Sequence, residues 1–455
     1  MHVAVIGAGA YGSYIINALI EKYPEIKITL FEVGNKAIKS ESEIGYKSNI
    51  LKDNYTGLDK GRFFGFGGAS AKWGGQLLTF SQNDFLSPGP FMADIINLNE
   101  KYREKVFKRF GIVNGFSENH LTKTLFTKTG VWLSYFNRNL FKYFNISKRK
   151  NVRIIENARI TKIEKEGQNI VGIAYLHNGE LKRTTFDHYF LTAGAFECNR
   201  ILLNSGLIKE NKCYFSDHLS QKVFKIKGST KIGNEDFAFR VNGASLITKR
   251  IIGEIDGVSF FVNPIYNSEF PFFHNLKLIL FKREFKLSVI KAVLSDFPSV
   301  FAFAYSMLIK KKIYVYKNEW YLFIDIENPN IASYISLSKE KDQFNETALD
   351  VSFEIGEKAS DIYERAKEIV KQYLILNKVT FVECSDKIHV EKSEDTYHPY
   401  GMQSDFNSAE EYFSHFQNML VINTGILPRA GGINTTAVCF SLIEEYISEY
   451  LKLKI

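Results

Sequence analysis

The feature that most restricts the fold is a β-branched run that leads directly into three closely spaced glycines. Residues 2–7 (HVAVIG) predict a strand, residues 12–22 carry apolar side chains at helical spacing, and residues 27–32 (KITLFE) predict a second strand. A strand, a helix and a second strand in this order form a βαβ unit, in which the two strands lie parallel in one sheet. We therefore expect an α/β protein with a Rossmann-like domain.

The three glycines and a later glutamate fit a bound dinucleotide. Gly7, Gly9 and Gly12 form a GxGxxG pattern, which supplies a tight turn, room for a pyrophosphate and close contact of helix and strand. The N-terminus of the helix that follows offers free N–H groups to phosphate. Glu32 ends the second strand, where a carboxylate is suited to hydrogen-bond the ribose hydroxyls of an adenosine. The pattern alone does not distinguish NAD from FAD.

Composition excludes several other classes of protein. Of the 455 residues, 45% are hydrophobic and 24% are charged, as in ordinary globular proteins. The net charge of +8 comes without a nucleic-acid-binding motif, so we expect no nucleic-acid partner. We expect neither a disulfide framework nor a metal site, because the four cysteines are far apart and form no CxxC pair. These are Cys198, Cys213, Cys384 and Cys439.

The hydrophobicity pattern predicts a cytoplasmic protein. The first residues lack the basic start and long apolar core of an export signal. The longest apolar stretch, Phe297–Leu308, is shorter than the roughly 18 residues that span a bilayer. One hypothesis for residues 275–320 is peripheral contact with the inner membrane face. The alternative, which the sequence favours, is an ordinary substrate-domain sheet with one helical hairpin. The cations that motivate the hypothesis are Lys282, Arg283, Lys291, Lys310, Lys311 and Lys312.

Several blocks of the chain resemble the glucose–methanol–choline (GMC) family of oxidoreductases. Within residues 61–75 (GRFFGFGGASAKWGG), Gly67, Gly68 and Ser70 match the GG-x-S core of the family's second flavin-contact loop. Three further blocks are similar to family segments: 191–207 (LTAGAFECNRILLNSGL), 215–220 (FSDHLS) and 327–337 (ENPNIASYISL).

The resemblance implies non-covalent FAD as the cofactor. Lys72 stands where some pyranose-oxidising relatives carry the histidine that bonds covalently to FAD, and lysine does not make that bond in the family. Asn423 takes a place that is usually Asp, which alters the charge near the cofactor. The implied cofactor-binding residues are Gly7, Gly9, Gly12, Glu32, Gly67, Gly68, Ser70, Lys72, Trp73, Ile160, Ala193, Gly194, Gly425, Gly432 and Thr435.

The active-site signature of the family has its counterpart in the C-terminal part of the chain. Residues 396–402 (TYHPYGM) and 418–440 resemble the pattern His-x-x-Gly, a strand, and Gly-Gly-x-Asn-x-Thr before the last helix. Carried over, His398 is the active-site histidine and Asn434 its partner. An imidazole is suited to accept the hydroxyl proton of an alcohol while the hydride leaves carbon, and a second polar group must hold the same oxygen. The resemblance thus implies hydride transfer to flavin N5, with His398 as general base.

The fold class expected is α/β (α+β overall), with a discontinuous Rossmann-like FAD-binding domain and a substrate domain on a mostly antiparallel sheet. The FAD-binding domain would comprise residues 1–100, 151–218 and 395–455. The substrate-binding domain would comprise residues 219–394, and residues 101–150 would form a helical or irregular insertion.

The function expected is oxidation of a primary or secondary hydroxyl on a small molecule or glycan, with a sugar as first choice because pyranose-oxidising members are the nearest in pattern. One alternative is a flavin-dependent non-redox or reductive sugar-modifying enzyme, such as an isomerase, on the same fold. A binding protein without turnover is disfavoured by the intact His398 and Asn434. An NAD-dependent enzyme is disfavoured by the single dinucleotide fingerprint. The electron acceptor is unknown from the sequence.

Overall fold

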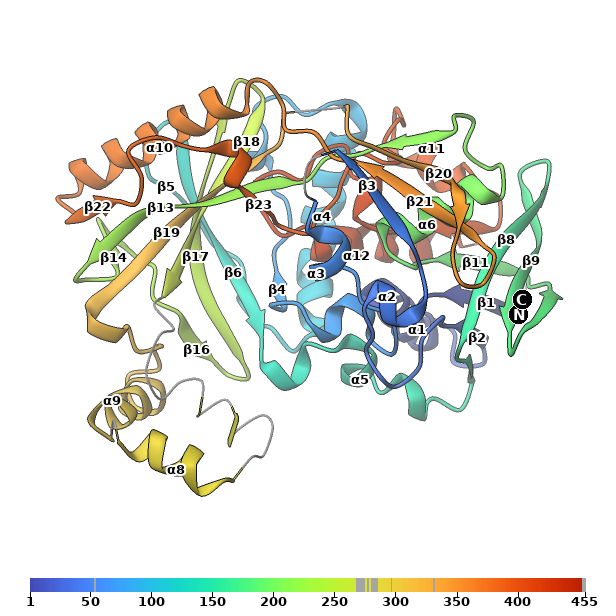
Figure 1. Ribbon diagram of the computed structural model, residues 1–455, viewed down its shortest axis with the longest axis horizontal. Helices are drawn as coiled ribbons and strands as arrows, with labels where there is room; N and C mark the ends of the chain where they lie inside the picture. Colours follow the sequence, from blue (N-terminus) through green and yellow to red (C-terminus); the bar gives the residue numbers. More distant parts are fainter. Residues whose placement is uncertain are drawn as a thin grey trace.

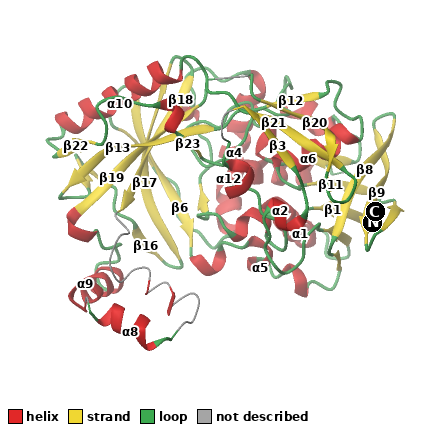
Figure 2. Ribbon diagram, in the orientation of Figure 1, coloured by secondary structure: helices red, strands yellow, loops and turns green. Residues whose placement is uncertain are grey.

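The computed structural model describes residues 1–52, 55–266, 275, 278–279, 285–295, 297–329 and 332–451. A parallel sheet with its helices forms one part of the molecule, and a large antiparallel sheet forms the other (Figure 1). Helices α4 (Pro90–Arg109) and α12 (Thr436–Glu445) lie between them, as the colouring by secondary structure also shows (Figure 2). The mixed α/β fold class expected from the sequence is confirmed.

The parallel sheet is assembled from distant parts of the chain. Its order is β24-β11-β1-β2-β7, and each neighbouring pair is parallel. Helix α1 (Ala10–Lys22) connects β1 to β2, as the βαβ prediction requires. The strands are β1 (His2–Ile6), β2 (Lys27–Phe31), β7 (Val152–Ile155), β11 (His188–Leu191) and β24 (Met419–Val421).

Both faces of this sheet are covered, which explains why its strands read as continuous apolar runs. On one face α1 packs against α12, where the rings of Tyr14 and Phe440 stack with centroids 4.2 Å apart. On the other face lie α6 (Ala195–Asn204) and an antiparallel meander. The meander consists of β8 (Ala158–Glu166), β9 (Asn169–His177) and β10 (Glu180–Thr184).

The large sheet is antiparallel throughout, with the central order β22-β13-β19-β18-β17-β6-β4. Helix α10 (Ala359–Leu376) packs against this sheet with its apolar stripe (Figure 1). The strands are β4 (Gln76–Leu77), β5 (Glu118–His120), β6 (Leu125–Leu133), β13 (His218–Lys227), β16 (Arg240–Asn242), β17 (Ser245–Ile255), β18 (Val258–Tyr266), β19 (Glu319–Glu327), β22 (Phe381–Glu383) and β23 (Glu394–Asp395).

Residues 101–150 differ from the helical or irregular insertion that the sequence predicted. They contribute β5 and the nine-residue strand β6, which pairs with β17 along its whole length. Most of β6 is buried, including the polar Thr127 and Lys128. The mixture of polar and apolar residues in LFTKTGVWL concealed the strand, because its polar groups find partners only in the folded protein.

The remaining elements are short. A third sheet places β3 parallel to β21 and so joins the N-terminal part to the middle of the chain. Its strands are β3 (Ser48–Lys52), β12 (Lys212–Tyr214), β20 (Tyr334–Lys341) and β21 (Thr347–Ser352), and β14 (Lys231–Ile232) pairs with β15 (Glu235–Asp236). The other helices are α2 (Glu41–Ile44), α3 (Gly57–Lys60), α5 (Leu140–Tyr143), α8 (Leu287–Leu294), α9 (Phe297–Leu308) and α11 (Ala409–Ser414).

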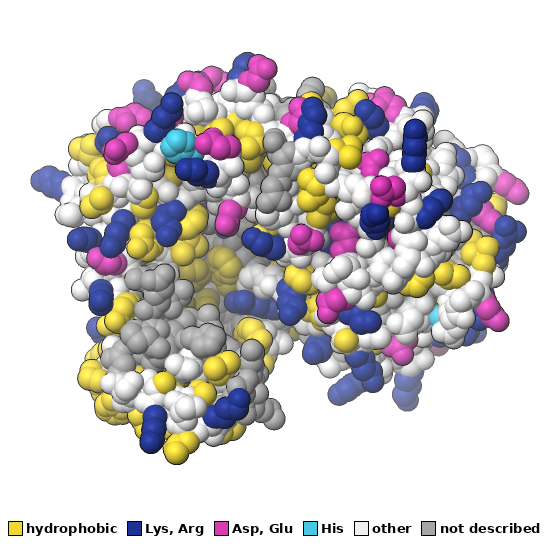
Figure 3. Space-filling model, in the orientation of Figure 1, with side chains coloured by type: hydrophobic (Ala, Val, Ile, Leu, Met, Phe, Trp, Pro, Cys, Tyr) yellow, Lys and Arg dark blue, Asp and Glu magenta, His cyan; other side chains and the backbone are white. Residues whose placement is uncertain are grey.

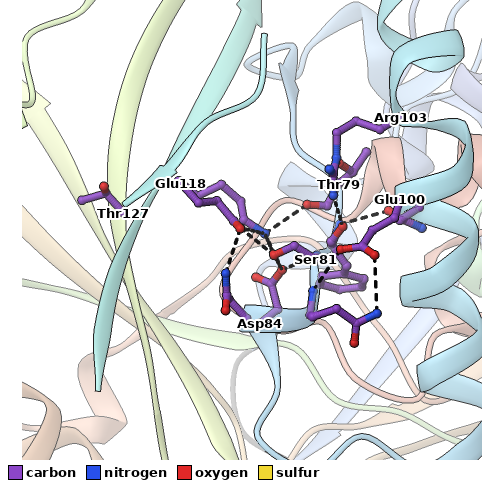
Figure 4. Close-up of polar contacts among 12 residues, drawn as sticks. Thr79, Ser81, Asp84, Glu100, Arg103, Glu118 and Thr127 are labelled. Atoms are coloured by element: carbon purple, nitrogen blue, oxygen red, sulfur yellow. Dashed lines mark hydrogen bonds and ion pairs between the residues drawn. The ribbon is translucent and has the colours of Figure 1, made fainter. Parts of the chain in front are cut away.

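A buried ion cluster ties the large sheet to the segment that precedes α4. The ammonium group of Lys128 on β6 pairs with Asp84 and with Glu118, the latter at 3.0 Å, and donates to Thr79 O at 3.1 Å. Figure 4 shows Ser81, Asp84 and Glu118 gathered between the strand and the helix. The side chains of Lys128 and Asp84 are both fully buried, so each charge depends on the other for compensation.

Replacing Asp84 should therefore destabilise the protein strongly. We expect Asp84→Ala to lower the free energy of unfolding by about 3–5 kcal/mol, because a buried ammonium loses its counter-charge. Urea unfolding would measure the change. Asp361→Ala is the matched control: its carboxylate is 71% exposed beside Arg365, and its loss should cost less than about 1 kcal/mol. Equal effects of the two substitutions would contradict the role of the cluster.

Candidate active site

A cavity of about 530 Å³ lies where five distant segments of the chain meet. Its wall is formed by the β1–α1 turn, the glycine-rich segment near residues 60–76, the β11–α6 turn, residues 396–399 and the start of α12. The carboxyl ends of parallel strands β1 and β11 open into it, which is where open α/β sheets bind their ligands.

The glycine turn has the geometry that a dinucleotide requires. A side-chain carbon at Gly12 would lie 2.0 Å from Gly7 O, so only glycine permits this contact between helix and strand. Gly7 has a φ of +102°, which disfavours any other residue. A side-chain carbon at Gly9 or Gly194 would meet no atom within 4 Å, so it would occupy the cavity itself. The cradle therefore fits the pyrophosphate of a dinucleotide beside the N-terminus of α1.

Glu32 is also a structural anchor of the cavity. Its carboxylate lines the wall and accepts hydrogen bonds from the backbone N–H groups of Ala8, Gly34 and Gly65, each at 2.9 Å. Burial raises the pKa of this carboxyl group, although the three hydrogen bonds oppose the shift. The sequence predicted a contact with ribose; the structure adds that Glu32 joins three loops around the cavity.

Most of the implied cofactor-binding residues lie on the cavity wall. Five of them lie behind the wall. A side-chain carbon at Gly67 would meet Asn139, one at Gly425 would meet Asn423 and Met402, and one at Gly432 would meet Ile252. Gly12 faces Gly7, and the side chain of Thr435 is buried. The residues on the wall are Gly7, Gly9, Glu32, Gly68, Ser70, Lys72, Trp73, Ile160, Ala193 and Gly194, together with His398 and Asn434.

His398 and Asn434 meet on this wall. Asn434 Nδ2 lies 3.2 Å from His398 Nε2. The backbone N–H of His398 donates to both carboxylate oxygens of Asp217 at 3.1 Å. His218, which the sequence marked only as part of an Asp-His segment, contacts Gly431 O through Nε2 at 2.7 Å and so fixes the turn before Asn434.

Arg250, which the sequence analysis missed, sets the orientation of this pair. It lies on β17, is 1% exposed, and its Nη2 donates to Asn434 Oδ1 at 2.9 Å and also to Gln76 Oε1. Because a guanidinium only donates, Asn434 must present its NH₂ group to His398. Nothing in the local pattern of β17 distinguishes Arg250 from a surface cation.

The same chain of hydrogen bonds determines the tautomer of His398. Thr396 Oγ1 donates to Asp217 Oδ1 at 3.2 Å, so it is free to accept from His398 Nδ1 at 3.2 Å. His398 Nε2 then accepts from Asn434 and carries no proton. Nε2 is thus the unprotonated ring nitrogen that a general base needs, and its lone pair is held by Asn434 until another donor replaces that contact.

The charges around His398 keep it neutral. Burial, together with the neighbouring His218 and Arg250, lowers the pKa of His398 to about 3. Burial lowers the pKa of Arg250 to about 9, and the buried carboxylate of Asp325 opposes this shift. Burial and the nearby Asp395 raise the pKa of Asp217. The imidazole is thus unprotonated at neutral pH.

No group of three or more His, Cys, Asp or Glu side chains is placed to hold a metal ion among the residues that the structure describes.

The fold and the cavity fit a bound dinucleotide, and the comparisons with known proteins indicate the class of protein. Residues 139–234 match the model of the GMC oxidoreductase family. The fold is similar to that of pyridoxine 4-oxidase from Mesorbium loti, with a TM-score of 0.57, 13% sequence identity and 99% of each chain covered. No protein of curated function matches the chain in sequence.

Residues 139–234 are thus similar to the GMC oxidoreductase family, and the whole chain has a fold similar to that of pyridoxine 4-oxidase. The protein is an oxidoreductase of the FAD type, as the sequence resemblance implied. Members of this family bind FAD, and the glycine cradle, Glu32 and the start of α12 are the parts of this chain that fit the cofactor.

Replacing Arg250 should impair the site without removing the cofactor. We expect Arg250→Met to slow anaerobic flavin reduction by about 10- to 100-fold, because Asn434 is then free to rotate its amide. Loss of the nearby positive charge should also raise the pKa of His398, so reduction should weaken further as the pH falls. Stopped-flow measurement of flavin absorbance across pH would test both effects.

Arg240→Met is the control for this experiment, because Arg240 lies on the adjoining strand β16 with its side chain 46% exposed. Its reduction rate should equal that of the wild type. If Arg250→Met keeps both the wild-type rate of flavin reduction and the wild-type pH profile, Arg250 has no role in orienting the site.

Proposed function

We propose that the protein oxidises a CH–OH group of a sugar or glycoconjugate, with His398 as the general base. The observation that carries the proposal is the 3.2 Å contact between the unprotonated Nε2 of His398 and the NH₂ group of Asn434 on the wall of the cavity. An alcohol that replaces this contact would donate its hydroxyl proton to Nε2 and accept from the NH₂ group of Asn434.

The residues of the site divide the work as follows. Once the substrate hydroxyl replaces Asn434 at the lone pair, His398 Nε2 accepts the hydroxyl proton, and an N–H of Asn434 holds the oxygen as the carbonyl forms. Arg250 and Asp217 keep the pair in position. Bound FAD would supply the chemistry of accepting the hydride from carbon.

Unpartnered donors near the pair support a substrate rich in oxygen atoms. Gln76 Nε2 and Trp132 Nε1 are buried without a hydrogen-bond partner, and both residues line the cavity. Hydroxyl and ring oxygens of a sugar would accept from them, and unsatisfied buried donors are costly otherwise. A small-molecule or glycan substrate with a primary or secondary hydroxyl fits this wall.

The second candidate is a flavin-dependent enzyme without net oxidation, such as a sugar isomerase. The same base and the same cavity would serve it, because proton abstraction beside a transiently formed carbonyl uses the same groups. Net bleaching of the flavin separates the two candidates.

The proposal predicts that His398→Ala keeps the flavin and loses its reduction. We expect anaerobic mixing of the wild type with a panel of aldoses and alditols, with pyridoxine included, to bleach the flavin band stably with at least one compound. Removal of the base should slow that reduction by about 10²- to 10⁴-fold. His389→Ala is the control, since His389 is 48% exposed and contacts Glu391.

Two outcomes would overturn the proposal. If the flavin of His398→Ala is reduced at the wild-type rate, His398 is not the general base. Bleaching that reverses without an external acceptor, with release of an isomerised sugar, would establish the second candidate.

We also propose that FAD is held without a covalent bond. Lys72 lines the cavity with its ammonium 6.0 Å from the ring centre of Phe63, at the position where relatives with a covalent bond carry histidine. Denaturation in acid should release all of the flavin, and mass spectrometry of the protein should show the mass of the unmodified chain. A flavin adduct on the denatured chain would refute this prediction.

A further inference from the structure

A pair of helices projects from the body of the protein below the large sheet (Figures 1 and 2). Helices α8 and α9 lie in the connection between β18 and β19 and contact each other. The pair is joined to the sheet after α9, where Ile313 N donates to Phe239 O at 2.8 Å.

The projecting pair exposes an unusual concentration of apolar side chains. Eight of the 23 exposed large hydrophobic residues in the described chain lie between residues 285 and 309. Figure 3 shows yellow side chains gathered on this projection. We call these eight residues the apolar tip: Phe285, Leu287, Leu294, Phe297, Phe301, Tyr305, Leu308 and Ile309.

The residues of the apolar tip on α9 form one continuous stripe. Phe297, Phe301 and Tyr305 recur every fourth residue, with ring centroids 6.5 and 6.4 Å apart. Helix α9 contains no charged residue. Val289 and Val293 on α8 are buried instead, and the two helices contact each other. The exposed stripe on α9 is therefore not needed for packing the two helices together.

Lysines surround this stripe. Lys286 precedes α8 and Lys291 lies in it, and Lys310 and Lys311 follow α9 after Ile309. Lys312 instead pairs with Asp236 at 2.8 Å. The single acidic residue of the sequence between positions 285 and 312 is Asp296. Lys282 and Arg283, which the sequence analysis had included, lie outside the described residues. An apolar face bordered by cations matches an anionic lipid surface, where the long side chains place their ammonium groups among headgroups.

The pair does not have the geometry of a single membrane span. Helix α9 has 12 residues, so it extends only about 18 Å against the roughly 30 Å hydrocarbon core of a bilayer. In the described part of the chain no single helix is long and apolar enough to cross a membrane, and α8 and α9 meet at 79°. Insertion to the depth of the interface is the arrangement that fits.

We propose that the α8–α9 pair docks the protein onto an anionic membrane surface, with the apolar tip inserted and the lysines at the headgroups. The projecting shape in Figure 3 favours a lipid surface over a folded partner, because lipids close around a convex tip whereas a protein must provide a matching hollow. The surface lies outside the cavity wall, so docking leaves His398 and Asn434 in place.

Vesicle sedimentation of the flavin-loaded protein tests this proposal. We expect binding to vesicles of phosphatidylcholine with one-third phosphatidylglycerol, weaker binding to pure phosphatidylcholine, and release of the protein by high salt. The double variant Phe297→Ser/Phe301→Ser should lose at least about tenfold in partition, because two exposed phenyl groups no longer insert. Lys310→Glu/Lys311→Glu should lose binding to anionic vesicles selectively.

Leu181→Ser is the matched control, since Leu181 is an equally exposed leucine (63%) on β10. It should bind vesicles like the wild type, and all variants should keep the wild-type flavin spectrum and unfolding temperature. Absence of sedimentation with anionic vesicles at low salt would overturn the proposal. So would light scattering that shows a dimer which the Phe297→Ser/Phe301→Ser variant dissociates, because the tip would then join two copies of the chain.

Discussion

The contact between His398 and Asn434 depends on the buried guanidinium of Arg250, whose charge interacts with the buried carboxylate of Asp325. Arg250 holds the oxygen of the Asn434 amide, and Asp217 holds the backbone of His398, so both members of the pair are fixed from behind. Burying a cation is costly, and here the guanidinium, which can only donate, decides which way the Asn434 amide points. The rest of the site follows from that choice: the tautomer of His398, its unprotonated Nε2 and the free N–H of Asn434.

The arrangement also explains why the two halves of the molecule must pack so firmly. Asn434 precedes α12, which packs on α1 and α4 of the nucleotide-binding part, whereas Arg250 belongs to the antiparallel sheet. A small shift between these parts would separate the guanidinium from the amide. The buried cluster of Lys128, Asp84 and Glu118 fastens the sheet to the segment before α4, and Ile252, two residues after Arg250, packs directly against Gly432.

Much of the nucleotide-binding part could be predicted from local sequence patterns. The strand, glycine turn, helix and strand of residues 2–32 were predicted with almost the observed bounds, because backbone geometry there follows from glycine and from alternation of apolar residues. Strand β6 was missed, since its polar residues gain partners only across the sheet. Gly67, Gly425 and Gly432 were assigned to the cofactor, yet they adjoin side chains of Asn139, Met402 and Ile252; a motif shows that glycine is needed, but not which neighbour needs it.

The sequence by itself determined the nucleotide cradle, because that turn is a local conformation. It also determined the pairing of His398 with Asn434, because both residues lie within one family-like block near the end of the chain. Tertiary structure alone decided that Arg250, Asp217, Gln76 and Trp132 surround that pair, and that α8 and α9 leave an apolar stripe uncovered. These outcomes depend on strand register and on which helix faces find a neighbour. Such contacts join residues more than a hundred positions apart, and no pattern within a short window records them.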